Sequence, residues 1–209
     1  MTRLTRIAGL SATLVAAGLL AACGGPGTPL GPPSAKDVLA KPTHSSLKDA
    51  HFLVTGKFTS QGASVDITGD GALVYKAPGA GRFKFQTLVA GQQVSFEDIS
   101  INGTDYTFSV PGNGKWTSRA TTSGLGPNSF TGASDFTYVG EESLPKGKSW
   151  HARAKDKDGN LFDGWIRESD GYPLKYTITQ QGNALTLSFD KYNTGESIAA
   201  PPASQVVQG

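Results

Sequence analysis

The chain has 209 residues, 19 basic and 17 acidic side chains and a single cysteine. Arg3 and Arg6 lie in an N-terminal segment without acidic residues, so the rest of the chain carries 17 charges of each sign. A net charge of zero gives no support to a nucleic-acid-binding surface, which requires an excess of positive charge.

The first 23 residues have the pattern of a bacterial lipoprotein signal. An apolar run from Ile7 to Leu20 follows the two arginines and ends in Leu20-Ala21-Ala22-Cys23. This run of about 14 residues is shorter than the about 20 that a membrane-spanning helix needs, although such a helix with an incidental cysteine is the alternative. We expect signal peptidase II to remove residues 1–22, leaving Cys23 to carry diacylglycerol and a further acyl chain such as palmitate. Acylation would hold the protein on the extracytoplasmic side of the cell membrane. It would also remove the only thiol, and with it disulfides, zinc-thiolate sites and a cysteine nucleophile.

A linker rich in glycine and proline follows the anchor. Residues 23–33 therefore read as the lipidated cysteine and a tether, and such a segment of ten residues extends over about 30 Å. We assign residues 34–203 to one β domain and residues 204–209 to an irregular tail.

The domain opens with the only clear helical pattern. Ser34 is a suitable N-cap for a helix that includes Val38 and Leu39, and Pro42 should kink or break it. A further turn or two is expected after Pro42, as far as Ala50.

From His51 onward the apolar period changes to two, which is typical of half-buried strands. A phase change between Phe96 and Ile99 predicts a β-bulge near Asp98. Asn102-Gly103 predicts a two-residue type I′ hairpin turn. In the second half, further strands are expected at residues 136–144, 149–155, 161–167, 174–178 and 185–189.

The expected fold class is mainly β, with about ten antiparallel strands in sequence. A short helix covers only about four strands at 4.8 Å spacing, so the sheet must curve strongly and enclose its own apolar face. We therefore expect a half-barrel with the short N-terminal helix over its concave face. Periodicity leaves open whether the interior is a filled core or a pocket.

Several short motifs occur in the order found in one bacterial superfamily. Residues 164–176 (GWIRESDGYPLKY) resemble its "WID…TGLPL" hairpin, residues 138–142 its "yvGee" strand and Lys115-Trp116 its "dGkW" turn. Residues 198–202 (IAAPP) are similar to its closing "I-x-x-P" strand. On these motifs the chain resembles the LolA/LolB lipoprotein carriers and the LppX/LprG-type lipoproteins over roughly residues 35–203.

This resemblance implies an apolar cavity in a curved half-barrel that binds lipid or acyl chains, for lipid or lipoprotein transport in the cell envelope. It also implies a transporter or lipoprotein of the envelope as a partner, and no cofactor. Apolar transfer gives roughly 25 cal/mol per Å² of chain surface removed from water. Residues 119–134 depart from the family, because they are rich in Gly, Ser and Thr where larger relatives place helices at the cavity mouth.

The apolar residues expected to face the concave side are either closed core or lipid contacts. They are Phe52, Val54, Phe58, Ile67, Leu73, Phe83, Phe85, Phe96, Tyr106, Phe108, Ile166, Leu174, Tyr176, Leu187 and Phe189.

Two other classes of function stay open as alternatives. One is a non-catalytic interaction or sensor module of the envelope with a closed core, marked by a large exposed apolar patch. The other is an enzyme, for which no GxSxG elbow, HExxH helix or P-loop is present and no histidine shares a motif with an acid. No catalytic or metal-binding residue is assigned, since residues 156–160 (DKDGN) resemble a hairpin turn more than a calcium loop.

Overall fold

The computed structural model describes residues 32–60, 63–121, 132–156, 158–180 and 183–209. Cys23, the signal and most of the tether lie outside these residues. Residues 32–209 form a compact unit of their own. Its elements are α1 (Ala35–His44), β1 (Asp49–Ser60), β2 (Ala63–Val74), β3 (Ala80–Val89), β4 (Gln92–Ile101), β5 (Thr104–Val110), β6 (Trp116–Ala120), β7 (Ser134–Leu144), β8 (Gly147–Lys155), β9 (Leu161–Arg167), β10 (Pro173–Gln180), β11 (Asn183–Tyr192), a 3₁₀ turn (Ala203–Gln205) and β12 (Val206–Gln208).

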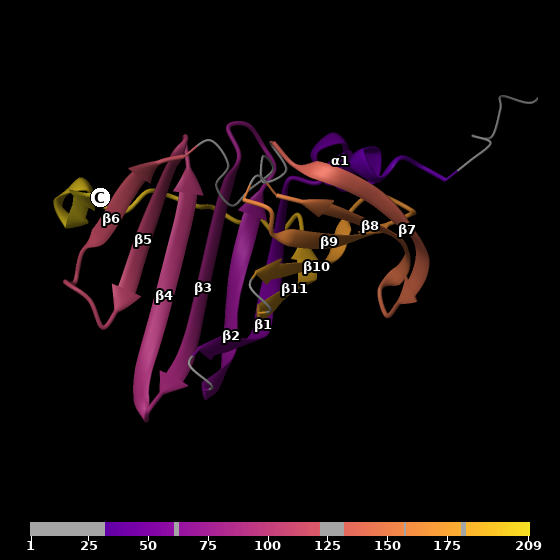
Figure 1. Cartoon of the computed structure of the whole chain (residues 1–209). Coiled ribbons are helices and arrows are strands. Elements are labelled where there is room, and N and C mark those ends of the chain that lie inside the picture. The colour runs from indigo at the N-terminus through magenta and orange to yellow at the C-terminus, as the bar shows by residue number, and fades with distance from the viewer. Residues whose placement is uncertain (1–31, 61–62, 122–131, 157, 181–182) are drawn as a thin grey trace, which may run out of the picture. The chain divides into compact units, whose positions relative to one another are not determined.

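The strands form one curved sheet that does not close into a barrel (Figure 1). Their order is β12-β6-β5-β4-β3-β2-β1-β11-β10-β9-β8-β7, and every neighbouring pair is antiparallel except β12 with β6. The mainly β half-barrel with one short helix is therefore confirmed. In the described residues it has twelve strands where we expected about ten, because β6 and β12 were not predicted.

The helix α1 begins where the sequence indicated and ends earlier than expected. The Ser34 hydroxyl accepts a hydrogen bond from the Asp37 backbone N–H at 3.1 Å, which satisfies a free donor of the first turn. Pro42 lies in the last turn, and the helix stops at His44. The expected further turn is wrong, since Ala50 already belongs to β1. Among the described residues, no helix is long and apolar enough to span a membrane.

The helix packs mainly on β7, β8 and β9, which lie beside it in Figure 1. Val38 and Leu39 are fully buried in this contact. Gly164 in β9 makes the close approach possible, because a Cβ atom there would lie 2.5 Å from the Leu39 Cδ2 atom. The face of the sheet that carries α1 is called the inner face below, and the opposite one the outer face.

The bulge expected near Asp98 is wrong. Pairing between β3 and β4 runs without a register shift, with Phe85 opposite Phe96 and Phe83 opposite Asp98. Ile99 therefore faces the other side from Phe96 and is buried on the outer face. The hairpin turn at Asn102-Gly103 is confirmed, since both residues have the positive φ angles, 52° and 72°, that a type I′ turn requires.

After β11 the chain crosses to the far end of the sheet. The buried Asp49 carboxylate accepts hydrogen bonds from the backbone N–H groups of Thr194 (2.8 Å) and Gly195 (3.2 Å), which fixes the turn that starts this crossing. The segment passes behind the strands in Figure 1 and ends in β12. Residues 198–202 do not form the closing strand that the resemblance implied, and part of the expected irregular tail forms β12 instead.

Candidate functional site

The strand register places one continuous apolar surface on the inner face. Directly paired residues point to the same side of a sheet, and the side alternates along each strand. Phe52 in β1 pairs with Phe189 in β11 and with Gly71 in β2, and Gly71 pairs with Phe83 in β3. The inner face therefore runs from β11 across to β4 through side chains that were expected there.

One half of this face is a filled core. Phe52 is fully buried, its ring centroid lies 5.4 Å from that of Phe189, and the Tyr176 ring meets Phe189 edge-on at 5.0 Å. Val54 and Leu187 pair directly beside them and are also buried. This half, beneath and beside α1, is closed hydrophobic core.

Gly71 lets the Phe52 ring approach the backbone of β2 closely. A Cβ atom at Gly71 would lie 2.3 Å from the Phe52 Cζ atom and 2.5 Å from the Arg82 carbonyl oxygen. Because no Cβ atom is present, the outer edge of the Phe52 ring can lie directly against Gly71. This glycine marks the border between the closed core and the rest of the inner face.

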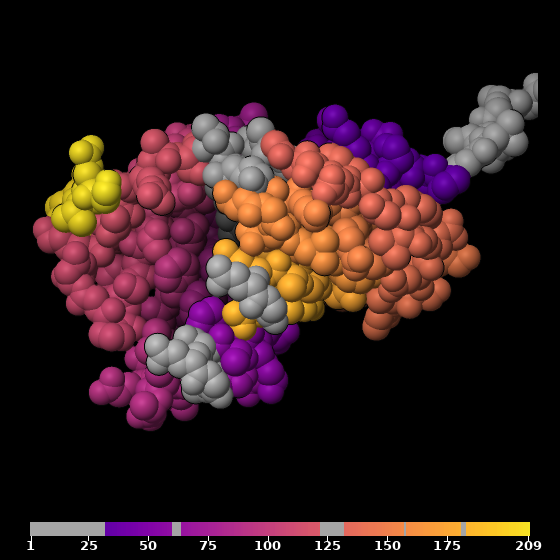
Figure 2. All heavy atoms as spheres, viewed as in Figure 1, coloured from indigo at the N-terminus to yellow at the C-terminus, as the bar shows by residue number. Residues whose placement is uncertain are grey.

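Beyond that border the inner face is apolar and half-buried. Phe83, Phe85 and Phe96 form one cluster, with ring centroids 5.6 Å apart for Phe83–Phe85, 5.8 Å for Phe83–Phe96 and 5.2 Å for Phe85–Phe96. All three rings remain partly exposed, because α1 packs mainly on β7, β8 and β9, at the other end of the sheet. Figure 2 shows a hollow between the magenta strands of this region and the orange strands of the β8–β10 region. The three phenylalanines are called the aromatic cluster below.

The expected concave-side residues fall into five groups, of which the last, Tyr106 and Phe108, lies on the other face. Closed positions are held by Phe52, Val54, Ile67, Leu73, Ile166, Tyr176, Leu187 and Phe189, while Phe83, Phe85 and Phe96 are half-buried. Phe58 points to the inner face and is 47% exposed near the end of β1. Leu174 is buried at an irregularity of the β9–β10 pairing.

Tyr106 and Phe108 lie on the outer face, which corrects their expected placement. In β5 they pair with Ile99 and Glu97, whose side chains point away from Phe96. Phe108 packs against Trp116 at 5.4 Å, and Tyr106 lines an outer hollow of about 800 Å³ together with residues of the C-terminal segment. A bulge at Asp98 would have turned Tyr106 and Phe108 to the inner face. Because β4 has no bulge there, both side chains point to the outer face.

Asp98 ends the apolar surface at the β4–β5 side. It lies on the inner face between Phe96 and Ser100, and the Ser100 hydroxyl donates hydrogen bonds toward Asp98 and Asp105. Burial raises the pKa of Asp98 to about 6, and the neighbouring charge of Asp105 adds to this rise. The aromatic cluster is therefore bordered by a carboxyl group that titrates just below neutral pH.

The outer face carries an ion network that sequence reasoning did not find. The His151 ring nitrogens lie 2.8 Å from Glu142 Oε1 and 2.7 Å from Asp163 Oδ1, and the ring stacks on Trp165 at 4.0 Å. Lys175 covers the other part of this stack, 3.5 Å from the Trp165 ring centroid. The sequence did hold one signal: the alternation along each strand places these side chains on the same face of the sheet. The network joins β7, β8, β9 and β10 on the outer face, whereas the aromatic cluster lies on the inner face.

The other polar groups weighed as catalytic or metal-binding have structural roles. His51 contacts Asp190 at 2.6 Å, and His44 is exposed at the end of α1. The Asp156 carboxylate accepts hydrogen bonds from the Asn160 backbone at 2.8 Å and the Asn160 amide at 2.8 Å, so it caps its own hairpin turn. Among the described residues, no group of three or more His, Cys, Asp or Glu side chains is placed to hold a metal ion.

Comparison with known proteins identifies similar structures only. No protein-family model matches the chain, and no curated protein gives a significant match. An uncharacterized conserved protein from Thermus thermophilus is 14% identical with a TM-score of 0.54, over 84% of this chain and 99% of that one, which shows a shared fold. LprF from Mycobacterium bovis (15% identity, TM-score 0.45) is matched over 82% of this chain and 99% of its own. The Mycobacterium tuberculosis lipoprotein LppX (14% identity, TM-score 0.44) is matched over 78% and 99%. At these identities the comparisons show a fold shared with the Thermus thermophilus protein and no more.

Proposed function

We propose that this protein is a lipid-anchored extracytoplasmic lipoprotein that binds an acyl chain or long-chain lipid on its inner face. The observation that supports the proposal best is the aromatic cluster. Phe83, Phe85 and Phe96 are half-buried, and the strand register points them to the concave side. In the described part of the chain, no helix covers these large apolar rings. Uncovered aromatic rings on a concave surface are typical of a site for an apolar ligand.

An acyl chain suits this surface physically. Burying one methylene group contributes about 0.8 kcal/mol, so eight or nine methylenes laid along the cluster would contribute about 7 kcal/mol before the cost of ordering the chain. This apolar gain requires no base-specific or charge-specific contact. The filled half of the inner face limits the ligand to the region of β2, β3 and β4.

The anchor gives this binding site its place in the cell. Cys23, acylated and joined by a tether of about 30 Å, would keep the site within reach of membrane lipid. Together with the resemblance to carriers of lipids and lipoproteins, this placement favours a role in moving lipid or acylated proteins through the envelope. A transporter or another lipoprotein would then be its partner.

Lipid uptake by the delipidated domain of residues 32–209 tests the proposal. A fluorescent fatty acid should bind saturably, and Phe96→Ser should weaken binding at least tenfold. Phe108→Ser is the matched control, because Phe108 is equally half-buried but lies on the outer face. Absence of saturable uptake, or equal loss in both variants, would contradict the proposal and favour a non-catalytic interaction module.

A further inference from the structure

Large exposed apolar side chains gather at one end of the sheet. Leu88 and Val89 are 67% and 44% exposed at the tip of the β3–β4 hairpin, and Phe58 is 47% exposed near the tip of the neighbouring β1–β2 hairpin. Both hairpins point to the lower end of the sheet in Figure 1. Single exposed apolar residues are normal on any protein surface, but three on adjacent tips form a patch.

The same tips are almost free of charge. No charged residue occurs from Phe85 through Phe96, which make up the half of the β3–β4 hairpin that is nearer the tip. On the neighbouring hairpin, Lys57 and Asp66 neutralise each other at 3.3 Å. An edge that combines protruding apolar side chains with uncharged Gln, Thr and Ser can enter a lipid interface without transferring an unpaired charge from water.

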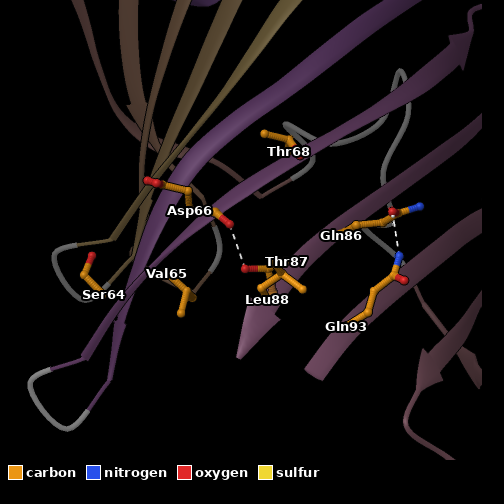
Figure 3. Close-up of a pocket in the computed structure, with 8 residues that line it drawn as sticks. All are labelled: Ser64, Val65, Asp66, Thr68, Gln86, Thr87, Leu88 and Gln93. Carbon is orange, nitrogen blue, oxygen red and sulfur yellow. Dashed lines mark hydrogen bonds between the residues drawn. The ribbon is translucent and has the colours of Figure 1, made fainter. Parts of the chain in front are cut away.

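The two hairpins separate before they reach their tips. Pairing between β2 and β3 stops at Thr68 opposite Gln86, although each hairpin continues for several residues beyond that point. A hollow of about 460 Å³ lies in this split, which Figure 3 shows. One hydrogen bond crosses it, from the Thr87 hydroxyl to the Asp66 carbonyl at 2.7 Å.

The split connects the tips with the inner face. Val65 and Thr87 line the hollow, and by their parity they belong to the same face as Phe85. The exposed Phe58 lies directly opposite Val65 on that face. The other lining residues, Ser64, Asp66, Thr68, Gln86, Leu88 and Gln93, belong by register to the outer face. A chain that entered between the tips on the inner side would therefore pass Phe58, Val65 and Thr87 before it reached Phe85.

We propose that the tips of the β1–β2 and β3–β4 hairpins dock on a lipid bilayer, with the split between them as the opening through which an acyl chain reaches the aromatic cluster. The docking stands on the exposure and the missing charge of the tips. The second part, passage of a chain, rests on the proposed lipid-binding function. The bilayer is the occupant because the patch protrudes on both faces of thin hairpin tips and offers no unpaired charge to a protein partner.

Vesicle binding by the domain of residues 32–209 tests the docking. The probe is a suspension of large unilamellar vesicles of phosphatidylcholine and phosphatidylglycerol in a 3:1 ratio, measured by co-sedimentation at physiological salt. The double variant Leu88→Ser/Val89→Ser should lose at least tenfold in partition coefficient. Leu53→Ser/Val139→Ser is the matched control, because those two side chains are 47% and 48% exposed elsewhere on the sheet. It should stay within twofold of the unmodified domain.

Uptake of a monomeric fluorescent fatty acid without vesicles separates the two proposals. The tip variant should keep its thermal midpoint while it loses vesicle binding. If the unmodified domain takes up fatty acid but does not bind vesicles, or if both double variants lose vesicle binding equally, the docking is overturned and the proposed function stands. If it binds vesicles through the tips but takes up no fatty acid, the docking stands and the proposed function fails.

Discussion

Substitution of Gly71 by alanine should destabilise the domain through one identifiable clash. The added Cβ atom would lie 2.3 Å and 2.6 Å from the Phe52 Cζ and Cε2 atoms, and 2.5 Å from the Arg82 carbonyl oxygen. Phe52 has no exposed surface and packs on Phe189, so its ring cannot move away without opening the core. Overpacking of this kind costs about 1–3 kcal/mol.

The net effect includes a smaller term of opposite sign. Alanine restricts the unfolded chain more than glycine does, which stabilises by about 0.4–1 kcal/mol. We expect Gly71→Ala to lower the free energy of unfolding by about 1–2 kcal/mol, and the thermal midpoint by about 2–8 °C for a domain of this length. Thermal unfolding followed by circular dichroism measures this shift.

A double-mutant cycle tests the assigned cause. Phe52→Leu removes the two ring atoms that clash, so Gly71→Ala should cost about 1 kcal/mol less in the Phe52→Leu background than alone. The contact with the Arg82 carbonyl remains in both backgrounds. A midpoint of Gly71→Ala within 1 °C of the unmodified domain, or strictly additive effects in the cycle, would refute the reasoning.

Three further predictions concern charge and anchoring. His151→Gln removes the 2.7 Å contact between the His151 ring and the buried Asp163 carboxylate, so urea unfolding should show a loss of about 2–3 kcal/mol. His51→Gln at its more exposed pair should cost less than about 1 kcal/mol, and equal losses would contradict the roles assigned. The raised pKa of Asp98 favours its protonated form in the folded state, so this group's contribution to stability is present below about pH 4 and is lost as the pH rises through about 6. Asp98→Asn should therefore raise stability at pH 7 by about 1–2 kcal/mol, allowing for solvent screening, and flatten the pH profile between 4 and 6; an unchanged profile would count against it. Cys23→Ala should move the protein from the membrane to the soluble extracytoplasmic fraction and abolish labelling with radioactive palmitate, whereas retained labelling would disprove the anchor.

Apolar alternation predicted the centre of the sheet well. The expected strand at residues 161–167 agrees with β9 at both ends, and Phe52, Val54, Leu187 and Phe189 pair in the core as their parity indicated. In β1 and β11 one face is buried and the other is exposed, so the period of two records the environment of each residue directly.

The predictions failed where apolar side chains lie on both faces. Ile99 is buried on the outer face beside Tyr106, which lines a hollow together with the C-terminal segment. A rule that places every apolar residue on the inner face therefore predicts a bulge at Asp98 that the strand does not have. Strands β6 and β12 were missed because they are only five and three residues long. Their pairing joins Trp116 to Val206 across 90 positions of sequence, a contact that local pattern cannot encode.

The candidate site was predictable as a surface but not as a pocket. The sequence pattern indicated that Phe83, Phe85 and Phe96 belong to the inner face, while their partial exposure depends on where α1 lies, which is set by contacts with β7, β8 and β9. The split between the hairpins has no sequence signal of its own, since it arises where the β2–β3 pairing ends.

Mass spectrometry of lipids that co-purify with the domain of residues 32–209 tests the central claim most directly. The account predicts a long-chain lipid or fatty acid at close to one molecule per domain, reduced at least tenfold by Phe85→Asp and unchanged by Phe108→Ser. A domain that carries neither a long-chain lipid nor a fatty acid, and that takes up neither when they are added, would contradict lipid binding on the inner face.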